Sequence, residues 1–326
     1  MLKRLKKLNK FKKSIRLKRN NFMDNKELKA FCNLIGLNCV GVAGVDKYDN
    51  LEKILKDRQQ KGYLTGMEEP IIENRINPRH IMKDANSIIV CAFPYHINRQ
   101  EKNKNSNLSK YCHGKDYHIV VKDFLQQICD YISKTVTDFK YKLFADNGPL
   151  VDRYLAYLSG IGYFGINNNI ITDEYGSYVF IGYIVNNYKF EEDKPLEKSC
   201  FKCGKCVKYC PGNAILGNYD MNPKKCLSYI TQKKGDLSEK EKVVLKNGKK
   251  VFGCDICQEV CPHNVEIPTT HILEFKENII DYLDYDEIQN ISNKEFKRRY
   301  GDRAFGWRGR NIIKRNMKII LDKYDD

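Results

Sequence analysis

The chain has 326 residues, 42% of them hydrophobic, which is enough for one large folded domain and a smaller one. Its longest apolar run, from Tyr178 to Val185, is far shorter than the roughly 20 residues that cross a bilayer, which argues against a membrane-spanning protein. Thirteen cysteines, with no apolar leader segment near the N-terminus, argue against a secreted disulfide framework. We therefore expect a cytoplasmic protein that ligates metal.

The formal net charge of +16 indicates a polyanionic partner, but the charge is unevenly distributed. Ten positive charges lie among the first 19 residues. This arm, taken as residues 1–22, is interpreted either as a disordered RNA-binding tail or as a segment upstream of a true start at Met23. A second basic concentration, near the C-terminus, is either an RNA-binding surface or a solvated helix face. Its members are Lys297, Arg298, Arg299, Arg303, Arg308, Arg310, Lys314 and Arg315.

Short apolar runs alternate with amphipathic stretches over residues 23–192, which predicts an α/β domain in a chain whose fold class is α+β or α/β. Ser87 to Phe93 is an apolar run stopped by Pro94 and predicts a buried strand. Lys115 to Val136 carries apolar residues at four-residue spacing and predicts a helix. Gly176 to Val185 predicts a second buried strand. A polar stretch then sets a domain boundary near Asp193.

The segment Gly160-Ile-Gly162-Tyr-Phe-Gly165 matches the dinucleotide-binding fingerprint as a string. That fingerprint requires a strand before it and a helix after it. Here Leu150 to Ser159 predicts a helix before it, and an Asn-rich turn follows. We therefore reject a dinucleotide site and interpret the glycines as a helix stop and as points of close backbone approach.

Residues 193–268 carry the cysteine spacing of a bacterial ferredoxin, in which three thiolates bind one [4Fe–4S] cluster and a fourth, before proline, reaches a second cluster. The later half-repeat supplies only three cysteines, so Cys226 is needed to complete eight ligands. The first predicted ligand set is Cys200, Cys203, Cys206 and Cys261; the second is Cys210, Cys226, Cys254 and Cys257.

Structural zinc is the alternative, because Cys-x-x-Cys pairs also suit tetrahedral zinc. The three-cysteine run followed by Cys-Pro, with its half-repeat, favours iron–sulfur clusters. Residues 269–326 are interpreted as a basic helical segment, in which Glu287 to Lys318 predicts two short helices.

Several segments, in consistent order from about Met23 to Met317, resemble the epoxyqueuosine reductase family. They are Arg75-Ile-Asn-Pro78, Gly114-Lys-Asp116-Tyr117-His118, Asp146-Asn-Gly-Pro149-Leu-Val-Asp152-Arg153, Gly160-Ile-Gly162-Tyr-Phe-Gly165, Cys226-Leu-Ser-Tyr-Ile-Thr231-Gln232-Lys-Lys234-Gly235 and Gly253-Cys254-Asp255-Ile-Cys257-Gln-Glu-Val-Cys261-Pro-His-Asn264.

Members of that family carry cobalamin beside two [4Fe–4S] clusters and reduce the epoxide of epoxyqueuosine to the alkene of queuosine at the transfer RNA wobble position. The resemblance thus implies an oxidoreductase with an N-terminal cobalamin-binding α/β domain and a ferredoxin-like domain. It also implies transfer RNA as substrate, a flavodoxin or ferredoxin-type electron donor, and a monomer.

By the same resemblance Asp146 is the proton donor and contacts cobalamin, and we expect burial against the corrin to raise its pKa. The alternative is a turn with an N-capping aspartate. Arg75, Asp255 and Ile256 would also contact cobalamin.

Lys234 would contact the RNA backbone, or is an ordinary solvated lysine. His118 is a polar contact near the cofactor or a structural histidine. Two other functions stay open: a cobalamin and iron–sulfur reductase of another substrate, such as a small organohalide, and a ferredoxin-like electron carrier without cobalamin.

Overall fold

A computed structural model of the chain describes residues 22–98 and 106–322. The predicted basic arm, apart from Phe22, therefore lies outside the described residues. Met23 is already part of the core, because it is 1% exposed and its backbone N–H donates to the Tyr188 hydroxyl at 2.9 Å. Within the described residues, no helix has the length and apolar character needed to cross a membrane.

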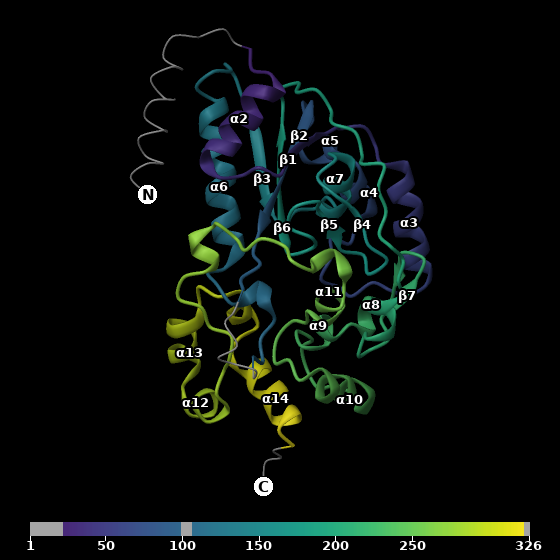
Figure 1. Cartoon of the computed structure of the whole chain (residues 1–326), viewed down its shortest axis with the longest axis vertical. Coiled ribbons are helices and arrows are strands. Elements are labelled where there is room, and N and C mark those ends of the chain that lie inside the picture. Colours follow the sequence, from purple (N-terminus) through teal and green to yellow (C-terminus); the bar gives the residue numbers. More distant parts are fainter. Residues whose placement is uncertain (1–21, 99–105, 323–326) are drawn as a thin grey trace.

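A four-stranded sheet forms the centre of the N-terminal part (Figure 1). In spatial order its strands are β1 (Val40–Ala43), β2 (Ser87–Pro94), β6 (Val179–Asn186) and β3 (Tyr141–Ala145). The predicted strands at β2 and β6 are confirmed. Every pairing is antiparallel, so of the two predicted classes α+β describes this part, and the α/β assignment of the N-terminal domain is corrected. The sequence also suggested α/β because β2 and β6 are buried on both faces, as parallel strands usually are.

Helices cover both faces of the sheet (Figure 1). Alternate residues of β2 point to opposite sides, so Ile89 belongs to one core and Ile88 to the other. The first core packs against α2 (Asn25–Ile35) and α6 (Tyr117–Ile132), and α6 confirms the predicted helix. The opposite side carries α3 (Asp49–Gln60), α4 (Ile72–Ile76), α5 (Pro78–Ile81) and α7 (Asp152–Leu158).

The glycine-rich segment follows helix α7 and contains no dinucleotide-binding turn. Gly160 has φ +67° at the end of the helix, and the chain continues into a short hairpin of β4 (Tyr163–Phe164) and β5 (Ile170–Ile171). A Cβ on Gly162 would lie 2.6 Å from the Ile171 carbonyl oxygen. The predicted helix before the glycines is confirmed, and a hairpin follows them in place of a helix.

The cysteine-rich part consists of short elements joined by turns. They are α8 (Lys205–Lys208), β7 (Ile215–Gly217), β8 (Asp220–Met221), η2 (Pro223–Lys225), α9 (Leu227–Ile230), α10 (Glu239–Gly248), α11 (Ile256–Glu259) and η3 (Pro262–Asn264). The half-repeat of the sequence places α8 and α11 at equivalent points, because each helix begins two residues after the first cysteine of a Cys-x-x-Cys pair.

The C-terminal part has three α-helices where two were predicted: α12 (Tyr285–Asn290), α13 (Asn293–Tyr300) and α14 (Arg310–Ile320). Ser292 caps α13 by accepting from the Glu295 N–H, and Gly309 at φ +78° precedes α14. These two positions divide a sequence that is helical in composition throughout. The remaining 3-10 turns are η1 (Lys110–Cys112), η4 (Leu273–Phe275) and η5 (Ala304–Arg308).

The C-terminal helices pack back on the rest of the molecule. Leu108 and Phe252 share a core with Ile313 of α14. The fully buried Asn316 amide donates to the Thr231 carbonyl at 2.7 Å and to the Val251 carbonyl at 2.8 Å. The parts thus share cores, and the predicted domain division at residues 193 and 269 stays a prediction.

Candidate functional site

The eight predicted cluster cysteines fall into two spatial groups. Burial is the main cause that raises the pKa of cysteines in both groups. The negative charge of nearby thiolates raises it further, and for each cysteine these nearby thiolates belong to its own group. The surface group is Cys200, Cys203, Cys206 and Cys261; the inner group is Cys210, Cys226, Cys254 and Cys257. The structure thus brings the predicted ligands together in the predicted sets, while ligation itself stays a prediction.

Among residues 22–98 and 106–322, no group of three Cys, His, Asp or Glu side chains is positioned to hold a single metal ion. The choice between zinc and iron–sulfur clusters rests on the cysteine spacing, in which a three-cysteine run and Cys-Pro are followed by a half-repeat.

Hydrogen bonds reach the sulfur atoms of the inner group. The Ala214 backbone N–H donates to Cys210 Sγ at 3.2 Å, and Asn169 Nδ2 donates to Cys257 Sγ at 3.8 Å. Such bonds are one of the means by which a protein sets the reduction potential of a cluster. Asn169 comes from the turn before β5, so the N-terminal part contributes to the environment of the inner group.

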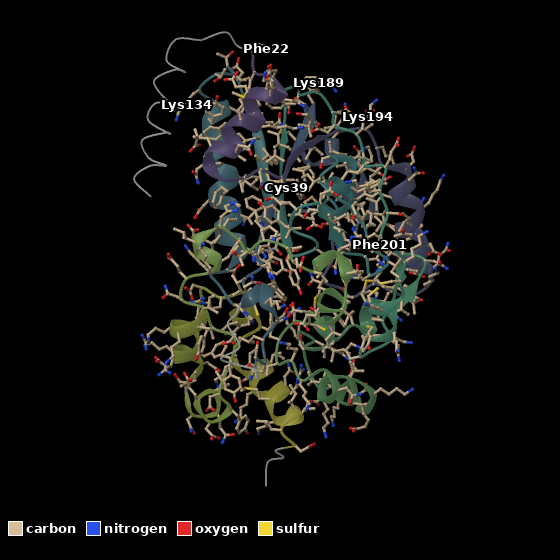
Figure 2. All side chains as sticks on the ribbon, viewed as in Figure 1. Phe22, Cys39, Lys134, Lys189, Lys194 and Phe201 are labelled. Atoms are coloured by element: carbon tan, nitrogen blue, oxygen red, sulfur yellow. The ribbon has the colours of Figure 1, made fainter. Side chains whose placement is uncertain are left out.

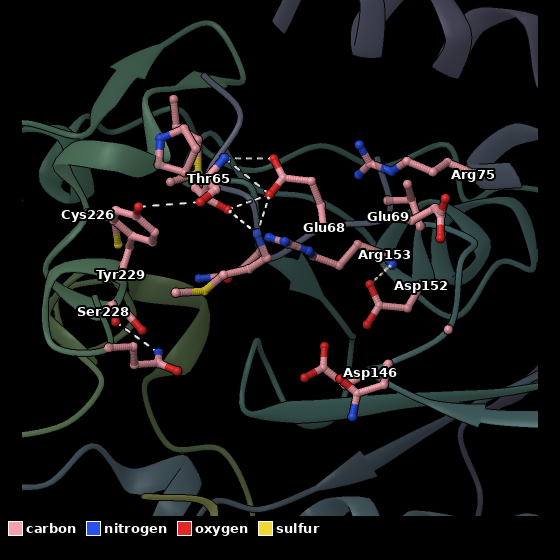
Figure 3. Close-up of a pocket in the computed structure, with 18 of the residues that line it drawn as sticks. Thr65, Glu68, Glu69, Arg75, Asp146, Asp152, Arg153, Cys226, Ser228 and Tyr229 are labelled. Carbon is pink, nitrogen blue, oxygen red and sulfur yellow. Dashed lines mark hydrogen bonds between the residues drawn. The ribbon is translucent and has the colours of Figure 1, made fainter. Parts of the chain in front are cut away.

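A cavity of about 1540 Å³ lies between the N-terminal sheet domain and the cysteine-rich part (Figure 3). All four cysteines of the inner group line it, and none of the surface group does. Its volume exceeds the 300–1,000 Å³ typical of small-molecule sites, so it has room for a large cofactor together with part of a substrate. A cluster held by these four cysteines would therefore lie at the wall of this cavity.

Asp146 lies on the opposite wall of the cavity from Cys226 (Figure 3). It directly follows strand β3 and adopts φ +61°, a left-handed conformation that is unusual for an aspartate and marks a constrained turn. Its side chain is 55% exposed. The Tyr117 hydroxyl donates to the carboxylate, and the Tyr117 ring is stacked on Phe180 at 4.3 Å between centroids.

His118 forms an ion pair with Asp146, at 3.4 Å from Nε2 to the carboxylate, while its Nδ1 lies 2.7 Å from Asp116. Burial raises the pKa of Asp146, but hydrogen bonds from His118 and Tyr117 outweigh burial and hold that pKa below its ordinary value. Burial lowers the pKa of His118, yet Asp116 and Asp146 outweigh it and raise the pKa to about 9.

These directions correct the expectation that burial keeps Asp146 protonated. At neutral pH the carboxyl is ionised and the proton resides on His118. The two interpretations of His118 were a polar contact near the cofactor and a structural histidine. The geometry favours the first, because Nε2 faces the Asp146 carboxylate in the cavity wall.

Three arginines line the same cavity, and Arg75 differs from the other two. Arg58 donates to the Met221 carbonyl and Arg153 to the Asn168 carbonyl. Arg75 has no hydrogen bond or ion pair with any residue of the described ranges, and burial lowers its pKa. A partly buried guanidinium without a protein partner suits a phosphate or amide oxygen of a ligand.

The structure does not bring the side chains of Asp255 and Ile256 to the cavity lining, which departs from the predicted contacts. Asp255 is 1% exposed, and its carboxylate accepts from the Ser109 hydroxyl at 2.6 Å and from the Lys110 N–H at 2.8 Å. From this loop, only the flanking cysteines and Gln258 reach the cavity. The Asp255 carboxylate is therefore already hydrogen-bonded within the protein and does not face the cavity.

Basic and aromatic side chains lie at one rim of the cavity. Trp307, 56% exposed, donates through Nε1 to Gln232 at 3.3 Å, and the Arg308 guanidinium lies 3.6 Å from its ring centroid. Trp307 also lines a second cavity of about 460 Å³, together with Lys297. Lys234 is exposed two residues beyond Gln232 and has no partner among the described residues.

Most of the C-terminal arginines have structural partners. Arg298 and Arg299 pair with Glu295. The guanidinium groups of Arg303, Arg310 and Arg315 donate to backbone carbonyls. Of the eight predicted basic residues, only Lys297, Arg308 and Lys314 lack a hydrogen-bond or ion-pair partner among the described residues.

Sequence reasoning assigned no role to Tyr117 or Trp307. Tyr117 stood inside a quoted motif, but nothing in the sequence joins it to Asp146, which is 29 residues away. Trp307 is the single tryptophan of the chain and lies within the basic segment, and that combination was the available signal.

The fold and the site define an iron–sulfur protein with a large cavity between its cysteine-rich part and an α+β domain. Residues 199–264 match the 4Fe-4S double cluster binding domain family, which confirms the prediction of two clusters, and residues 75–147 match the family described as Epoxyqueuosine reductase QueG, DUF1730. The chain belongs to the epoxyqueuosine reductase family, which confirms the resemblance found in the sequence.

Relatives match along most of the chain. The epoxyqueuosine reductase of Bacillus cereus is 36% identical over 320 residues, covering 93% of this chain and 82% of that protein. An epoxyqueuosine reductase solved with an epoxyqueuosine-modified tRNA-Tyr stem loop has TM-score 0.85 and 33% identity, covering 91% and 80%. The epoxyqueuosine reductase of Bacillus subtilis, solved with an aspartate-containing catalytic loop swung out of the active site, has TM-score 0.82 and 32% identity, covering 91% of this chain and 80% of that one.

The assignment of Cys226 to the inner group is tested by Cys226→Ser, with Cys39→Ser as the matched control because Cys39 lies in neither group. After anaerobic reconstitution, we expect about eight irons per chain in the control and about four in the variant. Iron and sulfide analysis with electron paramagnetic resonance measures this. Retention of eight irons in Cys226→Ser would assign the ligand to another cysteine.

Proposed function

We propose that this protein reduces epoxyqueuosine to queuosine in transfer RNA, with cobalamin bound in the main cavity. One observation carries the proposal: the cavity has the inner cysteines on one wall and Asp146 with His118 on the other. A source of electrons and a source of protons thus face one space. Relatives that are named epoxyqueuosine reductase, one of them solved with a modified tRNA stem loop, support the choice of substrate.

The residues of the cavity suit cobalamin. The corrin ring bears amide groups around its edge, and the nucleotide tail carries a phosphate, so the partnerless Arg75 would hold one of these oxygens. Cobalamin, when bound, would supply a cobalt centre that accepts single electrons and engages the substrate carbon. Asp255 and Ile256 would approach it through the backbone of their loop, because the Asp255 carboxylate is already satisfied.

The reaction consumes two electrons and two protons, because the epoxide oxygen leaves as water and an alkene forms. The inner cluster would deliver the electrons one at a time. Asp146 would give a proton to the departing oxygen after receiving it from His118 across the 3.4 Å ion pair. The Tyr117 hydroxyl would keep the carboxylate aimed at the cavity.

Transfer RNA would lie along the rim that carries Trp307. Because the wobble base must leave its stack to enter the main cavity, a neighbouring base can stack on the exposed Trp307 ring. Lys297, Arg308 and Lys234 would contact the backbone phosphates. The carboxylate-paired Arg298 and Arg299 are poorer candidates, since binding RNA would cost them their ion pairs.

The remaining assignments follow from this function. We place the protein in the cytoplasm, where transfer RNA is modified, and propose that it acts as a monomer that receives electrons from a flavodoxin or ferredoxin-type donor. No observation favours a small organohalide substrate or a carrier without cobalamin.

The function is tested with protein purified anaerobically from cobalamin-supplemented cells and supplied with a chemical reductant and epoxyqueuosine-containing transfer RNA. We expect queuosine, detected by mass spectrometry, and about eight irons and one cobalt per chain. Asp146→Asn should lower single-turnover rates by roughly 100- to 10,000-fold while iron and cobalt are retained, since it removes the proton donor. Cobalt binding without queuosine would refute the substrate, and iron without cobalt would indicate a carrier.

The proton supply predicts an alkaline limit. His118, with a pKa raised to about 9, is protonated below that pH and loses its proton above it. The single-turnover rate of pre-reduced enzyme should therefore be flat at neutral pH and fall above about pH 9, by up to tenfold per pH unit. The His118→Gln variant should react more slowly at neutral pH, and its rate should not fall above pH 9 in this way. If the variant showed the same fall in rate, another group would be responsible for the titration.

The RNA rim is tested by Trp307→Ala. Loss of one stacked base costs about 1–3 kcal/mol, so we expect KM for transfer RNA to rise roughly tenfold or more with kcat little changed. Trp307→Phe preserves a ring and should restore most of the affinity. Equal KM values for the alanine variant and the unmodified protein would remove Trp307 from the binding surface.

A further inference from the structure

The surface group of cysteines lies away from the main cavity. Cys203 is exposed, Cys200 and Cys206 are 9% and 8% exposed, and no member of the group lines the cavity. The inner group does line it. An electron that arrives from outside therefore meets the surface group first, and the protein surface near Cys203 is the natural point of entry.

That surface is basic and largely unpaired. From Lys198 to Tyr219 the chain contains four lysines and no aspartate or glutamate. Lys198 is paired with Asp173 at 2.7 Å. Lys202, Lys205 and Lys208 are exposed, and no carboxylate of the described residues forms an ion pair with them.

Exposed apolar side chains accompany these lysines. Phe201 is 69% exposed, and its ring stacks on His263 at 4.0 Å between centroids. Val265, two residues further along, is 67% exposed. The Lys202 ammonium lies over the Tyr219 ring, 5.8 Å from its centroid. Figure 2 shows Phe201 well away from Lys134 and Lys189, which lie towards the top of the view.

We infer that these residues form a docking surface for an acidic one-electron carrier protein. The surface consists of Phe201, Lys202, Lys205, Lys208, Tyr219 and Val265 around Cys203. The inference rests on the proposed function in one respect, that the surface cysteines hold a cluster. At each encounter the carrier would be oxidised by one electron and the cluster reduced by one, and two encounters would supply one epoxide reduction.

The chemistry of the surface selects this class of partner. Three unpaired lysines attract an acidic protein and repel a basic one, and they raise the rate of encounter more than the lifetime of the complex. The small apolar patch suits the limited contact area of transient electron-transfer complexes. Transfer RNA is also a polyanion and could bind the same surface. The experiment below distinguishes binding of an acidic protein from binding of transfer RNA.

The test compares two triple variants of the full, reconstituted chain. Lys202→Glu/Lys205→Glu/Lys208→Glu alters the surface, and Lys122→Glu/Lys134→Glu/Lys189→Glu makes the same charge change elsewhere. A photoreduced, acidic [2Fe–2S] ferredoxin is mixed anaerobically with each, and cluster reduction is followed by stopped-flow absorbance. At low ionic strength we expect the second-order rate constant to fall roughly 10- to 100-fold in the first variant and less than about twofold in the control.

Further measurements exclude indirect effects. At high salt the second-order rate constants of the two variants should become similar, since screening removes electrostatic steering. Methyl viologen radical cation, which needs no docking surface, should reduce the first variant at least as fast as the control. Iron content and the electron paramagnetic resonance signals should be unchanged. If charge reversal lowers the iron content of the protein, the corresponding Lys→Gln triple variant provides the same comparison with half the charge change.

Equal rates of reduction by ferredoxin in both triple variants would overturn the inference. A loss of transfer RNA binding with unchanged ferredoxin kinetics would assign the surface to RNA instead. The readout needs neither cobalamin nor transfer RNA. Protein that accepts electrons through this surface but forms no queuosine would therefore refute the proposed function and leave the docking surface standing.

Discussion

The arrangement of the site depends on one buried carboxylate. Asp255 lies between two cysteines of the inner group, and it accepts hydrogen bonds from Ser109 and Lys110. Burial raises its pKa, so these bonds and the charge of Lys250 offset a real desolvation cost. The carboxylate thus joins the cysteine loop to the segment that leads into α6. That segment ends at Asp116, which caps the helix and also holds His118.

A single short stretch of chain therefore links the electron side of the cavity to the proton side. Ser109 and Lys110 hold the loop of the inner cysteines, and Tyr117 and His118 hold Asp146. Packing reinforces the link, because the Tyr117 ring is stacked between His118 and Phe180. The distance between an electron donor and a proton donor affects the rate, so a rigid connection between the two is a functional requirement.

The sequence predicted those features that depend on local spacing. The cysteine spacing predicted the two spatial groups of thiols, and the apolar runs predicted β2, β6 and α6. It could not supply the direction of strand pairing, because fully buried strands look alike in parallel and antiparallel sheets. The ionisation of Asp146 was missed for a similar reason. It is set by Tyr117 and His118, whose approach depends on tertiary structure and on no spacing in the chain.

The basic C-terminal segment shows why charge counts overestimate binding surfaces. Arg315 donates to the Lys233 carbonyl, and Arg303 donates to the His113 carbonyl from a buried position. A guanidinium has five donors in a rigid fork, which suits backbone carbonyls as well as phosphates. Arg315 therefore fixes α14 against the cysteine-rich part, and Arg303 fixes the preceding turn against the segment that leads into α6. By holding that turn they also place Trp307 at the cavity rim, so their contribution to substrate binding would be through position and not through charge.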